Sequence, residues 1–253
     1  MISLQERFSA LIGFAGHKYE KFKYANPAAG LLFTLTQRHY HSQGLRFAYA
    51  REQTSLRFRS QYYYDIYEKS ERTLVHDFIR PDDRVLELGA CIGVVSCTTN
   101  RLLKAPGSRH VVVEANPELI PLLRRNRELN DCDFRIEHGI VSDGKETTFF
   151  VADRIHRGSV HEGTGAPLTV PSLRLGELER KYGPFNVLVI DIQGAEIDVL
   201  RHWEGFLGHY RLVIVEWHAA ITGEAAISDA RERLRNAGLR SARRLDTVEA
   251  WVR

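Results

Sequence analysis

The chain has 253 residues, of which 43% are hydrophobic and 26% charged, and its formal net charge is +3. This composition is that of a globular protein, and the length predicts one large domain or one domain with an N-terminal extension. The charge is too small to indicate a nucleic-acid binder by itself, and no apolar run approaches the ~20 residues of a membrane span. No secretory signal is visible, and the three cysteines fit no metal motif, so we expect reduced thiols in a cytoplasmic protein.

Residues 1–80 are predicted to form a cap that differs from the rest of the chain. Leu4–Tyr24 could be a helix, and the alternation of apolar and polar residues in Leu45–Tyr49 and Leu56–Arg59 predicts a β-hairpin. Tyr62–Ile79 is expected to be one further helix. Because the cap precedes the first strand of the second unit, we expect it to shape a ligand pocket there, and it could mediate a homodimer.

Residues 81–253 alternate between strand and helix patterns, which is typical of an α/β domain. The predicted strands are Arg84–Leu88, Arg109–Glu114, Phe134–His138, Thr147–Val151, Val187–Asp191 and Leu212–Trp217. The predicted helices are Gly93–Lys104, Pro117–Asn130, Leu173–Tyr182, Ala195–His202 and Ile227–Ala237. Leu239–Leu245 and Thr247–Val252 could form a terminal antiparallel hairpin, and Ala152–Pro171 is predicted to be a long surface loop. Near-continuous apolar strands indicate a seven-stranded, mostly parallel sheet with helices on both faces.

The most informative stretch is a strand that runs into a glycine turn, then a helix, then a second strand that ends on an acid. Gly89 and Gly93 leave room for a ligand beside the backbone, and Glu114 suits a bidentate grip on a ribose diol. The spacing is not the GxGxxG of a dinucleotide site, and Glu87 is suited to an ammonium rather than a pyrophosphate. A ligand with ammonium, carboxylate and adenosine ribose is S-adenosylmethionine; the alternative is a plain turn that binds nothing.

Other residues near these turns are candidates for lining the cofactor site. Ala90 lies in the glycine loop, and Ala115 follows Glu114. The third strand should deliver a contact to the adenine near its end, where Gly139, Ile140 and Val141 are the candidates, although Ile140 and Val141 could equally belong to the core.

A second group of polar residues follows the later strands and is predicted to carry the chemistry. Asp191 ends an apolar strand at the edge where ligands bind in doubly wound sheets, although it could also cap the next helix. Glu216 and His218 end the fifth strand, and His218 could be a general base or a solvent-facing residue. The three could together hold a divalent cation, but their spacing matches no firm motif, and we predict no metal. Tyr67 and Glu71 could line the site or pack their helix.

The segments VLELGACIGVVS, VVVEANPELIPLLRRNRELN, PSLRLGEL and VLVIDIQGAEIDVL resemble the FkbM-type S-adenosylmethionine-dependent methyltransferases, over roughly residues 65–220. The resemblance includes the asparagines Asn126 and Asn130. It implies a class I, Rossmann-like fold, S-adenosylmethionine as the methyl donor, S-adenosylhomocysteine as its product, and O-methylation of sugars or natural products. Two departures stand beside the presumed reaction centre: Val189 where the family often has Lys, and Gln193 where it often has Glu.

We therefore predict a small-molecule O-methyltransferase whose acceptor is a hydroxyl. A nucleic-acid methyltransferase is the first alternative, although strand four lacks the Asn/Asp-Pro-Pro-aromatic motif used on exocyclic amines. A non-catalytic homologue that binds the cofactor is the second, since Val189 and Gln193 depart from the family. Glu196 is interpreted as a complement to the N-terminus of its own helix.

Overall fold

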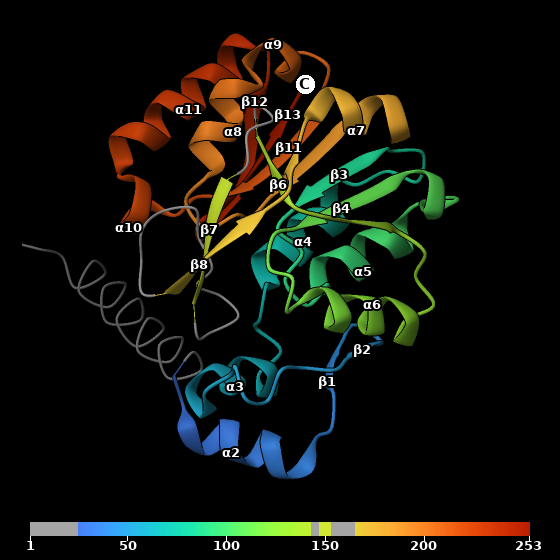
Figure 1. Ribbon diagram of the computed structural model, residues 1–253, viewed down its shortest axis with the longest axis vertical. Helices are drawn as coiled ribbons and strands as arrows, with labels where there is room; N and C mark the ends of the chain where they lie inside the picture. Colours follow the sequence, from blue (N-terminus) through green and yellow to red (C-terminus); the bar gives the residue numbers. More distant parts are fainter. Residues whose placement is uncertain (1–24, 143–146, 153–164) are drawn as a thin grey trace, which may run out of the picture.

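The computed structural model describes residues 25–142, 147–152 and 165–253. Its centre is a sheet of seven strands: β3 (Val85–Leu88), β4 (His110–Glu114), β5 (Arg135–His138), β10 (Val187–Ile190), β11 (Leu212–Glu216), β12 (Arg240–Leu245) and β13 (Val248–Val252). Their spatial order is β12-β13-β11-β10-β3-β4-β5 (Figure 1). The strands from β11 to β5 run parallel, and the hairpin β12–β13 adds two antiparallel strands at one edge. The predicted seven-stranded, mostly parallel sheet and its terminal hairpin are confirmed.

Helices cover both faces of the sheet, because its strands present apolar side chains on each face. The helices on one face are α7 (Leu175–Tyr182), α8 (Glu196–His202) and α11 (Glu224–Asn236), and those on the other are α4 (Lys69–Phe78), α5 (Val94–Leu102) and α6 (Ile120–Leu129). In β10, Leu188 and Ile190 pack toward the first set, whereas Val187 and Val189 pack toward the second. The shorter helices are η1 (Pro106–Ser108), α9 (Glu204–Leu207) and α10 (Ala219–Thr222). None of the described helices combines the length and the apolar character needed to cross a membrane.

The N-terminal part contains α2 (Pro27–Thr36), β1 (Tyr40–Ser42), β2 (Leu45–Phe47) and α3 (Leu56–Tyr63). One arm of the predicted hairpin is wrong: β2 pairs with β1, and Leu56–Arg59 begins a helix. Ser55 caps this helix, since its hydroxyl accepts a hydrogen bond from Phe58 N at 3.1 Å, and the buried Phe58 and Tyr62 lie one turn apart. An alternation over four residues is too short to separate a strand from a capped helix.

The single helix predicted over Tyr62–Ile79 is also wrong, because the chain breaks between α3 and α4. Asp65 and Glu68 lie in this break and have positive φ angles of 51° and 49°. A residue in the left-handed region does not continue a right-handed helix. The break lets α4 start afresh at the edge of the sheet, on which its apolar face packs. The division into a cap and a domain near residue 80 stays a prediction.

Two asparagines connect the N-terminal part to the sheet domain: Asn126 lies in α6, and Asn130 is the residue that caps its C-terminus. Asn126 accepts a hydrogen bond from Ala48 N at 2.7 Å, and its amide donates to Ala48 O at 3.0 Å and to Ile92 O at 2.8 Å. Asn130 accepts from Arg46 N at 2.9 Å and donates to Arg46 O at 2.8 Å. These side-chain amides satisfy backbone groups of β2 and of the glycine loop at once, so they set the position of one against the other.

Besides the β1–β2 pair, two further two-stranded sheets among the described residues lie outside the main one. They consist of the pairs β6 (Ile140–Val141) with β9 (Ser172–Leu173), and β7 (Thr147–Ala152) with β8 (Gly165–Val170). The strand predicted at Thr147–Val151 therefore exists but does not join the main sheet. The loop predicted over Ala152–Pro171 is wrong in its last part, where β8 forms against β7. Its middle part, and the helix predicted over Leu4–Tyr24, lie outside the described residues.

Candidate functional site

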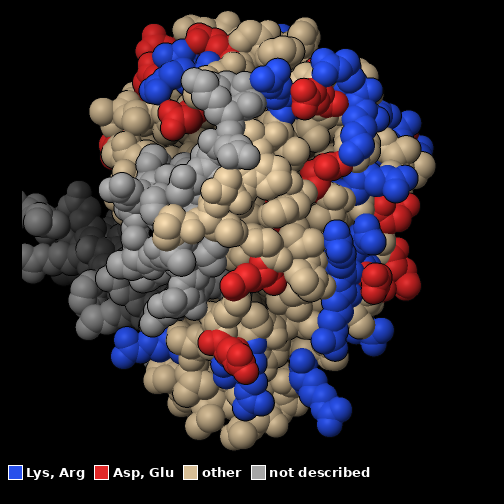
Figure 2. Space-filling view, in the orientation of Figure 1, with Lys and Arg blue, Asp and Glu red and all other residues tan. Residues whose placement is uncertain are grey.

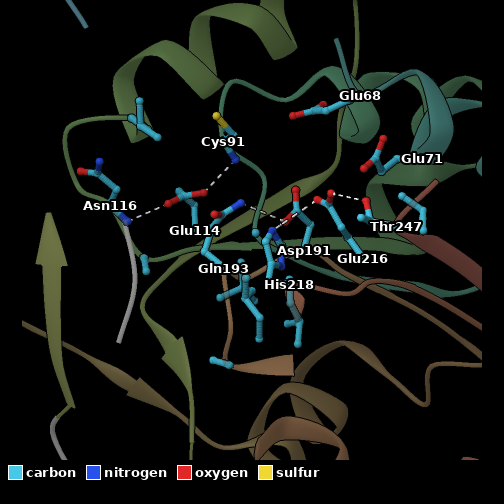
Figure 3. Close-up of a pocket in the computed structure, with 18 of the residues that line it drawn as sticks. Glu68, Glu71, Cys91, Glu114, Asn116, Asp191, Gln193, Glu216, His218 and Thr247 are labelled. Carbon is cyan, nitrogen blue, oxygen red and sulfur yellow. Dashed lines mark hydrogen bonds and ion pairs between the residues drawn. The ribbon is translucent and has the colours of Figure 1, made fainter. Parts of the chain in front are cut away.

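A cavity of about 440 Å³ opens at the carboxyl edge of the sheet (Figure 3). Its walls come from the glycine loop after β3, the ends of β4, β5, β10 and β11, and the start of α4. The predicted site residues that line it are Gly89, Glu114, Ala115, Gly139, Ile140, Asp191, Glu216 and His218. One cavity thus joins the predicted cofactor residues to the predicted catalytic residues.

Glu114 forms one end of the cavity, where backbone N–H groups hold its carboxylate. Its Oε2 accepts hydrogen bonds from Ala90 N at 3.1 Å and Cys91 N at 2.8 Å, and its Oε1 accepts from Asn116 N at 2.7 Å. Burial raises the pKa of Glu114, and the bonds from Asn116, Cys91 and Ala90 partly offset this by favouring the charged form. A carboxylate has about four lone-pair sites, so three N–H donors leave capacity for a hydroxyl. The glycine loop therefore fixes this acid at the end of β4, where a ribose diol requires it.

Glu87 does not line the cavity, so its predicted contact with the ammonium is wrong. Successive side chains of a strand point to opposite faces, and Leu86 and Leu88 face the side of α7 and α8. Glu87 faces the other side, where it is 1% exposed, accepts a hydrogen bond from the Ser96 hydroxyl and lies 3.1 Å from His110 Nε2. This carboxylate ties α5 and β4 to β3 beneath the glycine loop.

Close packing requires glycine at positions 89 and 93 of the loop. A Cβ on Gly93 would lie 2.6 Å from Leu123 Cδ1, and this residue lies outside the lining of the cavity, as does the buried Ala90. Gly89 has a φ of +85°, and a Cβ there would lie 1.7 Å from the backbone oxygen of Asp191. Gly89 thus lets the turn after β3 approach the turn after β10. Gly93 and Ala90, which are predicted to contact the cofactor, thus lie behind the lining of the cavity.

Asp191, Glu216 and His218 converge at the other end of the cavity (Figure 3). His218 Nε2 lies 3.7 Å from Asp191 Oδ1 and 3.6 Å from Glu216 Oε2. The other ring nitrogen, Nδ1, lies 2.7 Å from Oε1 of Glu196, which is fully buried. Thr247 holds Glu216 in turn, since its hydroxyl donates to Glu216 Oε1 at 2.9 Å. Glu196 therefore orients the imidazole so that Nε2 faces the cavity, a role beyond the helix contact interpreted from the sequence.

Two of the acids that line this end, Asp191 and Glu71, hold their protons more tightly than usual. Burial, then the charges of Glu216 and Glu71, raise the pKa of Asp191 well above its ordinary value. Burial and Glu216 likewise raise the pKa of Glu71 to about 7. Burial acts to lower the pKa of His218, but the hydrogen bond and charge of Glu196 and the nearby acids raise it overall. Glu71 therefore exchanges its proton near neutral pH, beside two groups, Asp191 and His218, whose pKa values are also raised.

Asp191, Glu196 and His218 are the described residues whose arrangement comes nearest to a metal site. Their ligand atoms lie within 4.8 Å of one another, a spacing that a divalent cation can bridge. Glu196 Oε1 is already committed, since it faces His218 Nδ1 and accepts from Gly194 N at 3.0 Å. The set thus has the geometry of a carboxylate-oriented histidine beside an acid, and the absence of a metal stays a prediction.

The structure also gives the position of residues whose role the sequence left undecided, and of one residue that the sequence did not indicate. Tyr67 and Glu71 both line the cavity, and Tyr67 OH donates to Cys91 Sγ at 3.3 Å. Glu68 was missed, because its place at the cavity depends on the break between α3 and α4. Of the two departures from the resembled family, Val189 packs in the core on the α4 face, away from the cavity. Gln193 does line the cavity, and its amide donates to Asp191 Oδ1 at 3.5 Å.

The fold and the site together define a class I, S-adenosylmethionine-dependent methyltransferase. The chain belongs to the family described as methyltransferase FkbM domain, whose model matches residues 87–241, more than half of the chain. The cavity fits the cofactor, because it offers a fixed carboxylate for the ribose and apolar side chains beside it at Leu119, Ile140 and Val141.

Solved structures of other methyltransferases are similar in fold. A methyltransferase from Pyrococcus furiosus has a TM-score of 0.50 and 14% identity, with 90% of this chain and 96% of that chain covered. A precorrin-6y C5,15-methyltransferase from Geobacter metallireducens has a TM-score of 0.47 and 11% identity, over 81% and 92% of the two chains. An O-methyltransferase from Bacillus cereus in complex with S-adenosylhomocysteine has a TM-score of 0.42 and 16% identity, over 74% and 80%. No curated protein matches the chain at significant similarity.

Proposed function

We propose that the protein transfers the methyl group of S-adenosylmethionine to a hydroxyl oxygen of a small molecule, such as a sugar or a natural product. The observation that carries this proposal is His218, which Glu196 orients and whose Nε2 faces the same cavity as Glu114. A hydroxyl becomes a methyl acceptor when a positioned base takes its proton in the transition state. An imidazole with one nitrogen bound to a buried carboxylate and the other facing the substrate is arranged for that step.

The chain's own residues would divide the work between the two ends of the cavity. S-adenosylmethionine, when bound, supplies the electrophilic methyl group. Glu114 positions the nucleoside, and His218 Nε2 accepts the hydroxyl proton. Glu196, whose Oε1 lies 2.7 Å from the far nitrogen, then stabilises the imidazolium that forms. Alignment of the acceptor and proton removal are the main demands of this reaction.

The charge of the cavity favours a small molecule over a nucleic acid. Figure 2 shows Lys and Arg side chains in a band along one edge of that view, interspersed with Asp and Glu. The acceptor end of the cavity is instead rich in carboxyl groups, which belong to Glu71, Asp191, Glu216 and Asp246, and Lys69 is the one Lys or Arg among the described lining residues. Phosphate groups bind to Lys and Arg, and a lining rich in carboxyl groups offers them few such partners. A volume of about 440 Å³ is within the range of small-molecule sites.

The test follows the methyl group to the atom that receives it. Purified protein is incubated with S-adenosylmethionine carrying a ¹³C-labelled methyl group and with panels of sugars, hydroxylated natural products and RNA. We expect a labelled product whose carbon chemical shift is that of a methyl ether, with no label on RNA and no loss of rate in EDTA. A label on nitrogen, carbon or RNA would overturn the proposal, as would cofactor binding without turnover of any hydroxyl compound.

A further inference from the structure

The position of Glu87 leaves the ammonium group of the cofactor without the partner that the sequence predicts. Glu68 offers a different carboxylate at the cavity. It immediately precedes α4, lines the cavity, and has a φ of 49°. Its Oε2 is buried and has no hydrogen-bond partner among the described residues. A buried carboxylate oxygen without a partner is costly, and its placement in a ligand cavity points to a ligand that supplies the missing donor.

We propose that the Glu68 carboxylate binds the α-ammonium group of S-adenosylmethionine. Figure 3 shows Glu68 on one side of the Cys91 loop and Glu114 on the other, so the two acids lie at separate points along the glycine loop. With the ribose at Glu114, the amino-acid end of the cofactor extends along this loop toward α4. This inference concerns the cofactor alone and does not depend on the identity of the acceptor.

The charged groups around Glu68 leave this place open for a cation. The charge of Arg72 acts on Glu68, but the Arg72 side chain is only 2% exposed and is already bound, at 3.1 Å to Asp65 and 3.0 Å to Tyr67 O. Lys69 lines the same cavity, but it is exposed to solvent and does not rank among the largest influences on the pKa of Glu68. Glu71 and Glu87 add negative charge. The field at Glu68 therefore favours a positive ligand group that arrives from the cavity.

The protonation of Glu68 supports the same assignment. Burial raises the pKa of Glu68 to about 8; a hydrogen bond with Tyr67 and the charge of Arg72 oppose this, and Glu71 and Glu87 add to it. At neutral pH, the side chain in the ligand-free cavity is therefore mostly protonated. An ammonium in contact favours the ionised form, so binding of the cofactor is expected to release a proton from wild-type protein and to release less from Glu68→Gln.

The experiment compares two ligands that differ only in the amino-acid end. S-adenosylhomocysteine carries the ammonium, and 5′-methylthioadenosine keeps the adenosine and the sulfur but lacks it. Calorimetric titration should show that Glu68→Gln weakens S-adenosylhomocysteine on the order of 10- to 100-fold, the range for a hydrogen bond to a charged group. The affinity for 5′-methylthioadenosine should stay within about twofold, because this ligand makes no such bond. Glu71→Gln is the matched control, since Glu71 is a buried acid one turn further along α4 whose largest interaction with another charged residue is with Glu216.

Each outcome decides the proposal. Equal weakening of both ligands by Glu68→Gln would mean that Glu68 only supports the shape of the loop, and unchanged affinity for both would mean that it makes no contact. A larger effect of Glu71→Gln than of Glu68→Gln on S-adenosylhomocysteine would move the ammonium site to Glu71. Melting of each variant without ligand reports its folding. Glu68→Asp, which keeps the charge on a shorter stem, should give an intermediate loss of S-adenosylhomocysteine affinity and serves if the glutamine variant does not fold.

Discussion

The two ends of the cavity use the same residue types in opposite ways. At the cofactor end, Glu114 accepts hydrogen bonds from three backbone N–H groups, at 2.7 to 3.1 Å. At the acceptor end, Asp191 and Glu216 face each other and one imidazole, and burial with mutual repulsion raises the pKa of Asp191. Backbone donors favour the ionised form of a buried carboxylate, whereas neighbouring acids favour its protonated form. The difference separates binding from chemistry within one cavity.

The largest effect is expected at the acceptor end, from His218→Gln. Glutamine fills similar space but takes no proton, so kcat should fall by about 10²- to 10⁴-fold, the contribution typical of a general base. The affinity for S-adenosylhomocysteine should not change, because His218 serves the acceptor. Steady-state kinetics with an identified acceptor and calorimetry on the same sample measure both quantities. An unchanged kcat would remove His218 from the mechanism.

The next effect is expected at the cofactor end, from Glu114→Ala. Loss of the charged hydrogen bonds to the ribose should weaken S-adenosylhomocysteine and 5′-methylthioadenosine alike, by about 10- to 100-fold. The matched control is Glu118→Ala, because Glu118 is an exposed acid four residues further along. Unequal effects on the two ligands would contradict the assignment of Glu114 to the ribose.

A smaller effect is expected from Glu196→Gln, which keeps the shape of the residue that orients His218. The kcat should fall about tenfold, as expected when one charged hydrogen bond of roughly 1.4 kcal/mol is lost. Glu196 raises the pKa of His218, and a base is active when deprotonated, so activity of the wild type should rise with pH through a pKa above 6.5. In the variant, the pH range over which the activity rises should move to lower values. A lower kcat with an unchanged pH dependence of the activity would indicate that Glu196 has a structural role only.

The smallest functional effect is expected from Glu87→Gln. Its carboxylate is buried against Ser96 and His110 outside the cavity, so the variant should lose stability by about 1–3 kcal/mol. Its affinity for S-adenosylhomocysteine at a temperature well below melting should equal that of the wild type. Chemical denaturation measures the free energy of unfolding, and calorimetry measures the affinity. A lower affinity for S-adenosylhomocysteine in a variant that remains stable would assign Glu87 to the cofactor site.

The sheet could be predicted from the sequence because its signals are local and strong. Val187–Ile190 is a continuous apolar run, and strands of this kind alternate with helix patterns along the whole second unit. The secondary structure of the N-terminal part was harder to predict. The Ser55 cap made a helix where four alternating residues indicated a strand, and the break at Asp65 and Glu68 has no periodic signal.

Some positions in the candidate site could likewise be predicted from the sequence, and others could not. Glu114 and Asp191 end their strands, and strand ends meet at one edge of a parallel sheet, so their place at the cavity follows from the sequence. Glu87 was misplaced, because alternation gives two faces but does not say which one meets the ligand. The partnership of Glu196 with His218 joins two separate elements across the sheet edge, and only the fold reveals such a contact.

The most direct test of the central claim measures His218→Gln and Glu114→Ala in both assays, kcat at saturating cofactor and Kd for S-adenosylhomocysteine. Separate roles predict that His218→Gln loses kcat and keeps Kd, and that Glu114→Ala weakens Kd and keeps most of kcat. Two variants that lose both quantities in equal proportion would contradict the division of the cavity into a binding end and a chemical end.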